Sequence, residues 1–178
     1  MHQSIKYTVI VIAAFFLVSC NDNLSMQRYF VDHQESKNFL AQDVPITILN
    51  IDESKLTSEQ REAYKSVDRL NLLAYKLDST NVSEYNAELL KVKTILKNEN
   101  YNELIDFSYN GAKIAVKYVG DEEADEFIIF GSSKEMGFGI IRVLGDDMSP
   151  EKIMTLGQLF ENSNVDTSQF ENIIPFFK

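Results

Sequence analysis

The sequence predicts an α+β fold, in which an antiparallel sheet of about four to six strands ends in a C-terminal meander and carries helices on one face. Two observations lead to this class. Four strand-like apolar runs follow one another between residues 104 and 144, and short polar turns separate them. Segments with the apolar spacing of amphipathic helices precede and follow these runs.

The chain opens with the parts of an export signal. Lys6 supplies a positive charge, and residues 8–18 form an uninterrupted run of largely apolar residues. A helix that spans the hydrocarbon layer requires about 20 such residues, so this run is too short to cross a bilayer. We therefore predict that residues 1–19 are a signal peptide.

Cys20 is the single cysteine of the chain and follows the apolar run directly. The order Leu17-Val18-Ser19-Cys20 resembles a bacterial lipobox, in which the thiol receives a diacylglyceryl group and the peptide is cut just before it. Leu17 supplies the apolar residue three positions back, and Ser19 supplies the small residue before the cysteine. We predict lipidation at Cys20, with residues 20–25 as a short tether; the alternative is an ordinary cleaved signal with an incidental cysteine.

Lipidation would place the protein in the cell envelope, anchored to a membrane through Cys20. Each buried methylene contributes about 0.8 kcal/mol, and two or three acyl chains hold a protein stably. We favour the outer membrane, and the sequence leaves open whether the domain faces the periplasm or the exterior. Residues 26–178 are predicted to form one α+β domain, which suits their number.

The predicted domain begins with a helix over residues 26–42, where apolar residues from Met26 onward fall near one stripe. Residues 44–51 then alternate apolar and polar positions. Pro45, near the start of this run, suits an edge strand, because a missing N–H does little harm there.

Thr57 and Gln60 have the spacing of a capping box and predict a helix start. The end of that helix is ambiguous. Apolar residues from Ala63 to Leu77 keep a helical spacing, yet residues 68–77 also fit a strand, which we favour. Ser83 is expected to cap the next helix, whose apolar face is formed by Tyr85, Leu89, Val92 and Leu96.

The meander is predicted from four apolar runs and the turns between them. Asn110-Gly111 supplies the positive φ angles that a tight hairpin requires. Ser149 then caps a last helix, and Pro150 takes its first position. The four runs are Leu104 to Tyr109, Ala112 to Val119, Phe127 to Gly131 and Phe138 to Leu144; the last helix buries Ile153, Leu156, Leu159 and Phe160, and an apolar tail, which we expect to pack on the domain, contains Phe170, Ile173, Ile174, Phe176 and Phe177.

The surface is predicted to be acidic. The chain has 17 basic and 27 acidic residues, and Lys6 is the only charged side chain before Cys20, so the mature chain carries a net charge of −11 (16 − 27). Such a surface repels phosphate backbones and anionic head groups, which argues against nucleic-acid partners.

No catalytic, metal-binding or cofactor-binding residues are predicted. His33 is the only histidine after the signal, so a multi-histidine metal site is excluded, and we interpret it as a helix-surface residue. The acidic run of residues 120–126 lacks the spacing of a calcium loop and is interpreted as a solvated hairpin loop. Asp146 and Asp147 are interpreted as a loop before the last helix, and Gly137-Phe138-Gly139 as a tight turn entering a strand.

Ser79 is a candidate modification site. Asp78-Ser79-Thr80 is similar to the short motif that Bacteroidetes use for O-glycosylation of exported proteins, and it lies in a polar stretch. We therefore predict that Ser79 is exposed and available to a glycosyltransferase.

Several segments resemble a family of small Bacteroidetes envelope proteins that is known only as a domain of unknown function. The resemblance implies an α+β domain, often behind a lipoprotein signal peptide, and brings no catalytic residues. The segments that carry it are Met26-Gln27-Arg28-Tyr29-Phe30, Tyr101-Asn102-Glu103-Leu104-Ile105, Asn110-Gly111-Ala112-Lys113-Ile114, Ile140-Ile141-Arg142-Val143-Leu144-Gly145 and Met148-Ser149-Pro150-Glu151-Lys152-Ile153.

Three functional hypotheses remain. The leading one is a non-catalytic, membrane-anchored binding or regulatory module whose sheet or helical face meets another envelope protein. The second is an enzyme or carrier that acts on glycans or envelope polymers through carboxylates, which would require a pocket with two acids about 5–10 Å apart. The third is ligand sequestration in a cleft beside the aromatic tail.

Overall fold

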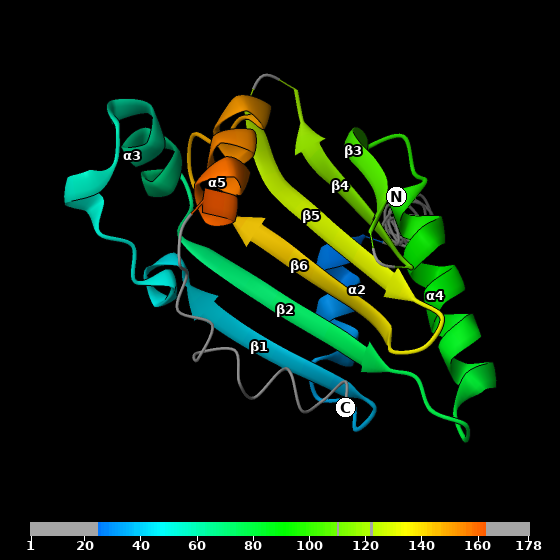
Figure 1. The fold of residues 1–178 in the computed structure, drawn as a ribbon. Coiled ribbons are helices and arrows are strands. Elements are labelled where there is room, and N and C mark those ends of the chain that lie inside the picture. The colour runs from blue at the N-terminus through cyan, green and yellow to red at the C-terminus, as the bar shows by residue number, and fades with distance from the viewer. Residues whose placement is uncertain (1–24, 110, 122, 163–178) are drawn as a thin grey trace, which may run out of the picture.

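The computed structural model describes residues 25–109, 111–121 and 123–162. Its centre is one antiparallel sheet of six strands in the order β1-β2-β6-β5-β4-β3 (Figure 1). The strands are β1 (Phe39–Pro45), β2 (Arg69–Lys76), β3 (Asn102–Tyr109), β4 (Ala112–Gly120), β5 (Ala124–Ser133) and β6 (Gly137–Leu144). The α+β class and the C-terminal meander β3–β6 are therefore confirmed, with strands slightly longer than predicted.

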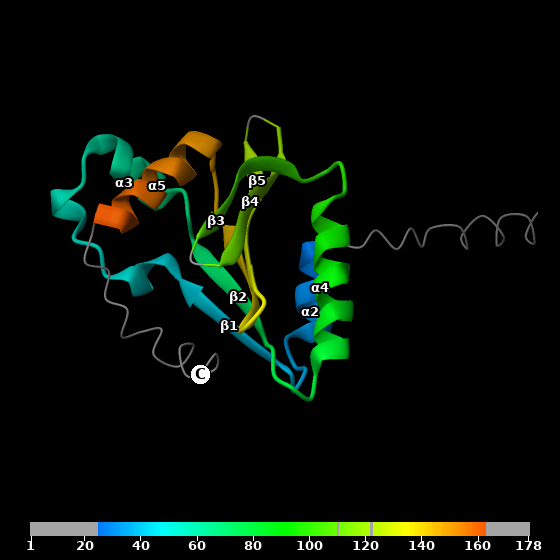
Figure 2. The same ribbon diagram turned by 45° about the vertical axis from the view of Figure 1, so that its right-hand side comes forward.

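The helices lie on both faces of the sheet rather than on one (Figure 2). They are α2 (Met26–His33), α3 (Ser58–Lys65), α4 (Val82–Leu96) and α5 (Pro150–Asn162). Helices α2 and α4 cover one face, while α3 and α5 pack together at one end of the other. The cause is visible in β5, where Phe127, Ile128, Ile129 and Phe130 form a continuous apolar run, which is typical of a strand covered on both faces.

Each face of the sheet has its own hydrophobic core. Under α2 and α4, the core contains Tyr29, Tyr75 and Phe138, and the last two rings stack with centroids 5.5 Å apart. Under α3 and α5, Phe127, Met148 and Leu156 are buried. Strand residues alternate between the two cores, because successive side chains point to opposite faces.

The first helix and first strand differ from the prediction. Helix α2 ends at His33 rather than near residue 42, and β1 occupies residues 39–45 rather than 44–51. The polar residues after His33 form turns instead of continuing the helix, with Phe39 N–H donating to the Ser36 carbonyl at 3.0 Å. Strand β1 is an edge strand as expected, but Pro45 is its last residue, and two short 3₁₀ helices follow at Ile46–Leu49 and Glu53–Lys55.

The ambiguity after Thr57 is settled in favour of a strand. The capping box is present, since Thr57 Oγ1 accepts from Gln60 N–H and Gln60 Oε1 accepts from Thr57 N–H. Helix α3 ends at Lys65, and β2 follows between β1 and β6. Leu73 is fully buried in this strand.

Helix α4 begins at Val82, so Ser83 lies inside it and does not cap it. Its predicted apolar face packs against the sheet, and the buried side of α5 is likewise as predicted. None of the helices in the described part of the chain combines the length and apolar content needed to cross a bilayer. The predicted signal peptide, Cys20 and the apolar tail lie outside the described residues.

Candidate functional site

The sheet face beneath α2 and α4 changes from apolar to polar along its strands. In β2 the residues that point to this face are Arg69, Asn71, Leu73 and Tyr75 in chain order, and only the last two belong to the hydrophobic core. The helices cover the apolar half. The polar half lies beyond the start of α2 and the end of α4.

Strand pairing brings further polar side chains into the same rows. Asn71 pairs with Asp43 of β1 on one side and with Arg142 of β6 on the other. Glu126 of β5 lies one row further along, on the same face as Arg142, because alternate residues share a face. A polar floor is thus assembled from four neighbouring strands.

This floor is the base of an open pocket of about 690 Å³, which we call the polar pocket. Its rim combines Ser25, which precedes α2, with Asn98 and Asn100, which follow α4. The polar pocket is lined by Ser25, Gln27, Asp43, Arg69, Asn71, Asn98, Asn100, Tyr101, Val119, Asp125, Glu126, Arg142 and Leu144.

A buried ion pair holds the floor together. Arg142 Nε and Nη2 donate to Glu126 Oε2 at 2.8 and 2.6 Å, and each side chain is only 11% exposed. The Arg142 guanidinium also lies 5.5 Å from the centroid of the Phe30 ring of α2, a distance typical of a cation–π contact. The pair therefore connects the sheet to the first helix.

Two more hydrogen bonds shape the walls. Asn71 Nδ2 donates to the Asp43 carboxylate, and Met26 N–H donates to the Tyr101 hydroxyl at 2.9 Å. The second bond satisfies one of the backbone N–H groups that a helix start leaves open. Burial, followed by the nearby charge of Glu126, raises the pKa of Tyr101, so its hydroxyl stays neutral at physiological pH.

Other polar groups of the pocket remain available. Within the described residues, the side chains of Arg69 and Asp125 take part in no hydrogen bond or ion pair. Gln27, Asn98 and Asn100 are exposed at the rim. Asn98 Oδ1 already accepts from Asn100 N–H at 3.1 Å, which leaves the Asn98 amide N–H groups and the side-chain amides of Gln27 and Asn100 to face a ligand. The pocket thus presents charges of both signs together with amides.

Two of the three acids that line the pocket are already engaged by neighbouring side chains. Glu126 is bound by Arg142, and Asp43 already accepts from Asn71. In the described parts of the chain, no three histidine, cysteine, aspartate or glutamate side chains are grouped closely enough to hold a metal ion. The arrangement favours recognition of a polar partner.

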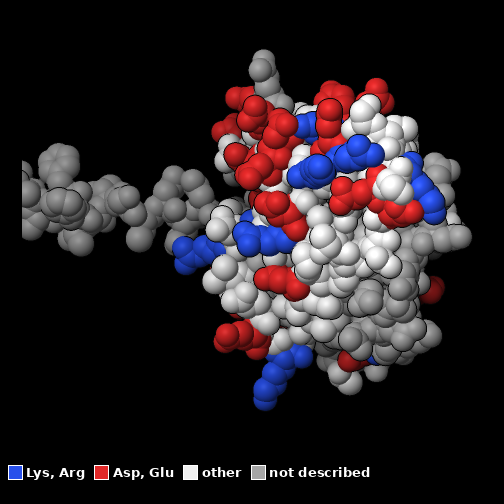
Figure 3. Space-filling view, turned by 90° about the vertical axis from the view of Figure 1, so that its left-hand side faces the viewer, with Lys and Arg blue, Asp and Glu red and all other residues white. Residues whose placement is uncertain are grey.

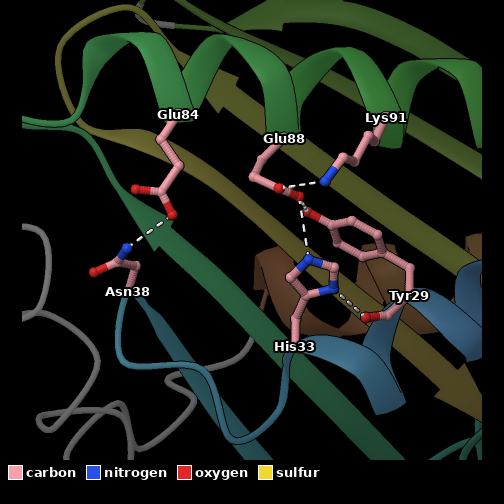
Figure 4. A network of polar contacts seen from close by, with 6 residues as sticks. All are labelled: Tyr29, His33, Asn38, Glu84, Glu88 and Lys91. Atoms are coloured by element: carbon pink, nitrogen blue, oxygen red, sulfur yellow. Dashed lines mark hydrogen bonds and ion pairs between the residues drawn. The ribbon is translucent and has the colours of Figure 1, made fainter.

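A second polar cluster, which we call the α2–α4 clasp, joins the two helices (Figure 4). Glu88 of α4 accepts from Tyr29 Oη at 2.8 Å and from Lys91 Nζ at 2.6 Å. His33 places Nε2 3.2 Å from the Glu88 carboxylate and donates from Nδ1 to the Tyr29 carbonyl at 2.7 Å. The interpretation of His33 as a helix-surface residue is therefore wrong, because its side chain is only 18% exposed.

The clasp controls the ionisation of its members. Burial alone would raise the pKa of Glu88, but hydrogen bonds from Lys91 and Tyr29 and the charge of His33 outweigh it and hold that pKa below its usual value. Burial and the same hydrogen bond raise the pKa of Tyr29 far above its usual value. Glu88 is therefore an ionised acceptor that fixes α2 to α4 and, through α2, fixes the rim of the polar pocket.

We expect the clasp to make the protein less stable in acid. Since the folded pKa of Glu88 lies below its ordinary value of 4.5, its stabilising contribution is complete above that pH and is lost as the pH falls through the lowered pKa. Replacing Glu88 by glutamine is expected to cost about 1–3 kcal/mol at neutral pH and less as the pH falls through the lowered pKa of Glu88. Urea unfolding followed by circular dichroism at pH 7 and pH 3 measures both effects.

Glu84→Gln is the matched control for this experiment, because Glu84 lies one turn earlier on α4, is exposed, and accepts a hydrogen bond from Asn38 Nδ2 at 2.8 Å. Its substitution is expected to change the free energy of unfolding by less than about 0.5 kcal/mol. An equal loss for the Glu84 and Glu88 variants at pH 7 would contradict a stabilising role for the clasp.

The acidic run before β5 is only partly the solvated loop that was predicted. Asp121, Glu123 and Asp125 are exposed, but Glu126 is buried in the ion pair with Arg142. The prediction placed Glu126 in the loop with the other acids of the run. Glu126 is instead the third residue of β5, and its side chain points to the sheet face.

The remaining candidate residues lie away from the polar pocket. Ser79 is exposed between β2 and α4, as predicted, next to Asp78, whose carboxylate accepts from Thr80 N–H and Oγ1–H at 2.7 and 2.6 Å. Its glycosylation stays a prediction. Asp147 binds Lys152 Nζ at 2.6 Å in the loop before α5, and Gly137 adopts φ +125° at the start of β6.

On the face that carries α3, the lysine and arginine side chains do not form a continuous basic patch (Figure 3). Acidic side chains gather over the upper part of this face, with basic side chains between them. A surface of this kind gives no continuous path for a phosphate backbone.

The comparisons with known proteins yield a family match without an assigned activity. The family model described as "Domain of unknown function (DUF4252)" matches residues 29–156. No curated protein matches the chain, and no solved structure matches it. The matched residues include the strands that form the floor of the polar pocket and all four residues of the α2–α4 clasp.

Proposed function

Since the chain belongs to the DUF4252 family of domains of unknown function, we propose its function from its own geometry: it is a membrane-anchored, non-catalytic module that binds another envelope protein in the polar pocket. The observation that carries the proposal is the polar end of a sheet face whose other half is a closed hydrophobic core. Charged side chains on the central strands of a sheet lower the stability of the fold unless they are paired with another charged or hydrogen-bonding group, either in the protein or in a bound partner.

The chemistry of the pocket favours a polar protein segment as the ligand. Arg69 and Asp125 offer charges of opposite sign, and the amides of Asn98 and Asn100 can pair with backbone N–H and C=O groups. A neutral glycan would satisfy the amides but would offer no charged partner to Arg69 or Asp125. Anionic lipid head groups are disfavoured by the acidic surface.

The predicted anchor supports the same proposal. Ser25 forms part of the pocket rim, and Cys20 lies five residues before it. Five extended residues span at most about 17 Å. A lipidated Cys20 would therefore keep the polar pocket close to the membrane surface. The pocket could then reach the parts of other membrane-bound proteins that lie next to the membrane.

Photo-crosslinking from the pocket rim tests this function. A photo-reactive amino acid in place of Asn100, in the full chain in its own membranes, is expected to give a reproducible covalent product with another envelope protein. Arg69→Glu, which reverses one charge of the pocket, is expected to reduce that product about tenfold, corresponding to about 1.4 kcal/mol.

Leu90 is the control position, because it is 66% exposed on the outer surface of α4. The same photo-reactive residue at Leu90 is expected to give little of this product. Identical products from both positions, or lipid adducts alone from Asn100, would contradict the proposal.

A further inference from the structure

The opposite face of the sheet carries an open apolar groove, which we call the apolar groove. It has a volume of about 550 Å³ and lies between the sheet and α5. Pairing of β4, β5 and β6 places Val116, Ile129 and Ile141 in one row across its floor. Phe107 of β3 and Met154 and Phe160 of α5 also line it.

The groove exists because α3 and α5 cover only one end of this face. Val116, Ile129 and Ile141 belong to the apolar cluster of that face but are only partly buried. At the rim, Phe107 of β3 is 44% exposed and Met154 of α5 is 39% exposed. A contiguous apolar surface of this kind on a water-facing protein indicates a binding surface.

We propose that the apolar groove is filled by the segment of this chain that follows α5, residues 163–178, through its apolar side chains. The segment continues directly from the helix that forms one wall of the groove. Five large apolar residues fall within eight positions, namely Phe170, Ile173, Ile174, Phe176 and Phe177.

The length of the segment allows this arrangement. Phe170 lies eight residues after Asn162, a stretch that can span up to about 28 Å. Helix α5 has 13 residues and is about 20 Å long. The segment is therefore long enough to turn back along the whole length of α5, which forms one wall of the groove.

The apolar side chains of the segment match the apolar lining of the groove. A volume of about 550 Å³ lies in the range of ordinary ligand pockets, which have room for several side chains. The segment would shield an otherwise exposed surface, separate from the polar pocket on the opposite face.

Crosslinking from both walls of the groove tests this inference. A photo-reactive residue in place of Met154 or of Phe107, in the full chain in its own membranes, is expected to form a product within one chain, joined to a peptide from residues 170–177. Electrophoresis shows whether the product has the mass of a single chain, and mass spectrometry identifies the joined peptide.

Variants of the segment give the matched comparison. Phe176→Asp together with Phe177→Asp is expected to reduce the internal product at least about tenfold, whereas Thr167→Asp together with Gln169→Asp is expected to leave it within about twofold. A photo-reactive residue at Val31, which is 59% exposed on α2, is expected to give no such product.

Any other occupant overturns the inference. A product between two copies of the chain, with a different protein, or with lipid would each assign the groove to that partner instead. Absence of the 170–177 peptide at both Met154 and Phe107 would exclude the segment as the occupant. These outcomes are independent of the Asn100 experiment, because the two surfaces lie on opposite faces of the sheet.

Discussion

Replacing Arg142 by methionine is expected to lower the free energy of unfolding by about 3–5 kcal/mol. The substitution keeps most of the apolar stem but leaves the Glu126 carboxylate, 11% exposed, without the guanidinium that donates to it twice. It also removes the contact of that guanidinium with the Phe30 ring. Urea unfolding followed by circular dichroism measures the loss.

The double variant Glu126→Leu with Arg142→Met distinguishes the cost of an unpaired buried charge from the cost of lost packing. Removing both charges leaves no unpaired group, and buried ion pairs replaced in this way are often neutral or stabilising. We expect the double variant to lie within about 2 kcal/mol of the wild type. A double variant as unstable as Arg142→Met alone would show that the loss comes from packing and not from an unpaired charge.

Replacing Cys20 by alanine is expected to abolish lipidation, so that any protein that has lost residues 1–19 leaves the membrane fraction. Two or three acyl chains hold a protein stably at a membrane, and none of the described helices is long and apolar enough to cross one. Fractionation of cells after carbonate extraction, followed by immunoblotting, measures the change.

Asn21→Ala is the control for this substitution, because it alters the neighbouring residue and leaves the predicted lipobox intact. It is expected to remain in the membrane fraction. A Cys20→Ala protein that stays on the membrane would require a different anchor.

Local signals were enough to predict most of the fold. The capping box of Thr57, the helix-start residues of α5 and the apolar runs of the meander each contain their own structural information within a few residues. The resemblance to a domain of unknown function is also confirmed, since the matched model covers residues 29–156; its envelope, lipoprotein and Bacteroidetes parts stay predictions. These features depend on neighbours in the sequence and not on tertiary contacts.

The errors arose where a tertiary contact decides the outcome. The end of α2 and the start of β1 depend on pairing with β2, which the periodicity of residues 26–51 does not reveal. The prediction of helices on one face overlooked a signal in β5. Its four consecutive apolar residues are typical of a strand that is covered on both faces.

The polar pocket was missed for a related reason. Its residues are far apart in the chain, and only the strand register brings Asp43, Asn71 and Arg142 into one row. One sequence signal was present: alternate positions of residues 69–75 change from polar to apolar at the midpoint of the strand. Glu88 and His33 gave no such signal, because their contact depends on how α2 packs against α4.

Mass spectrometry of the N-terminal peptide, from protein purified out of its own membranes, tests the central claim most directly: that this domain is held at a membrane by its lone cysteine. We expect a mature chain that starts at Cys20 and carries the mass of a diacylglyceryl group on the sulfur. An N-terminus at any other residue, or an unmodified Cys20 thiol in the membrane-bound protein, would contradict it.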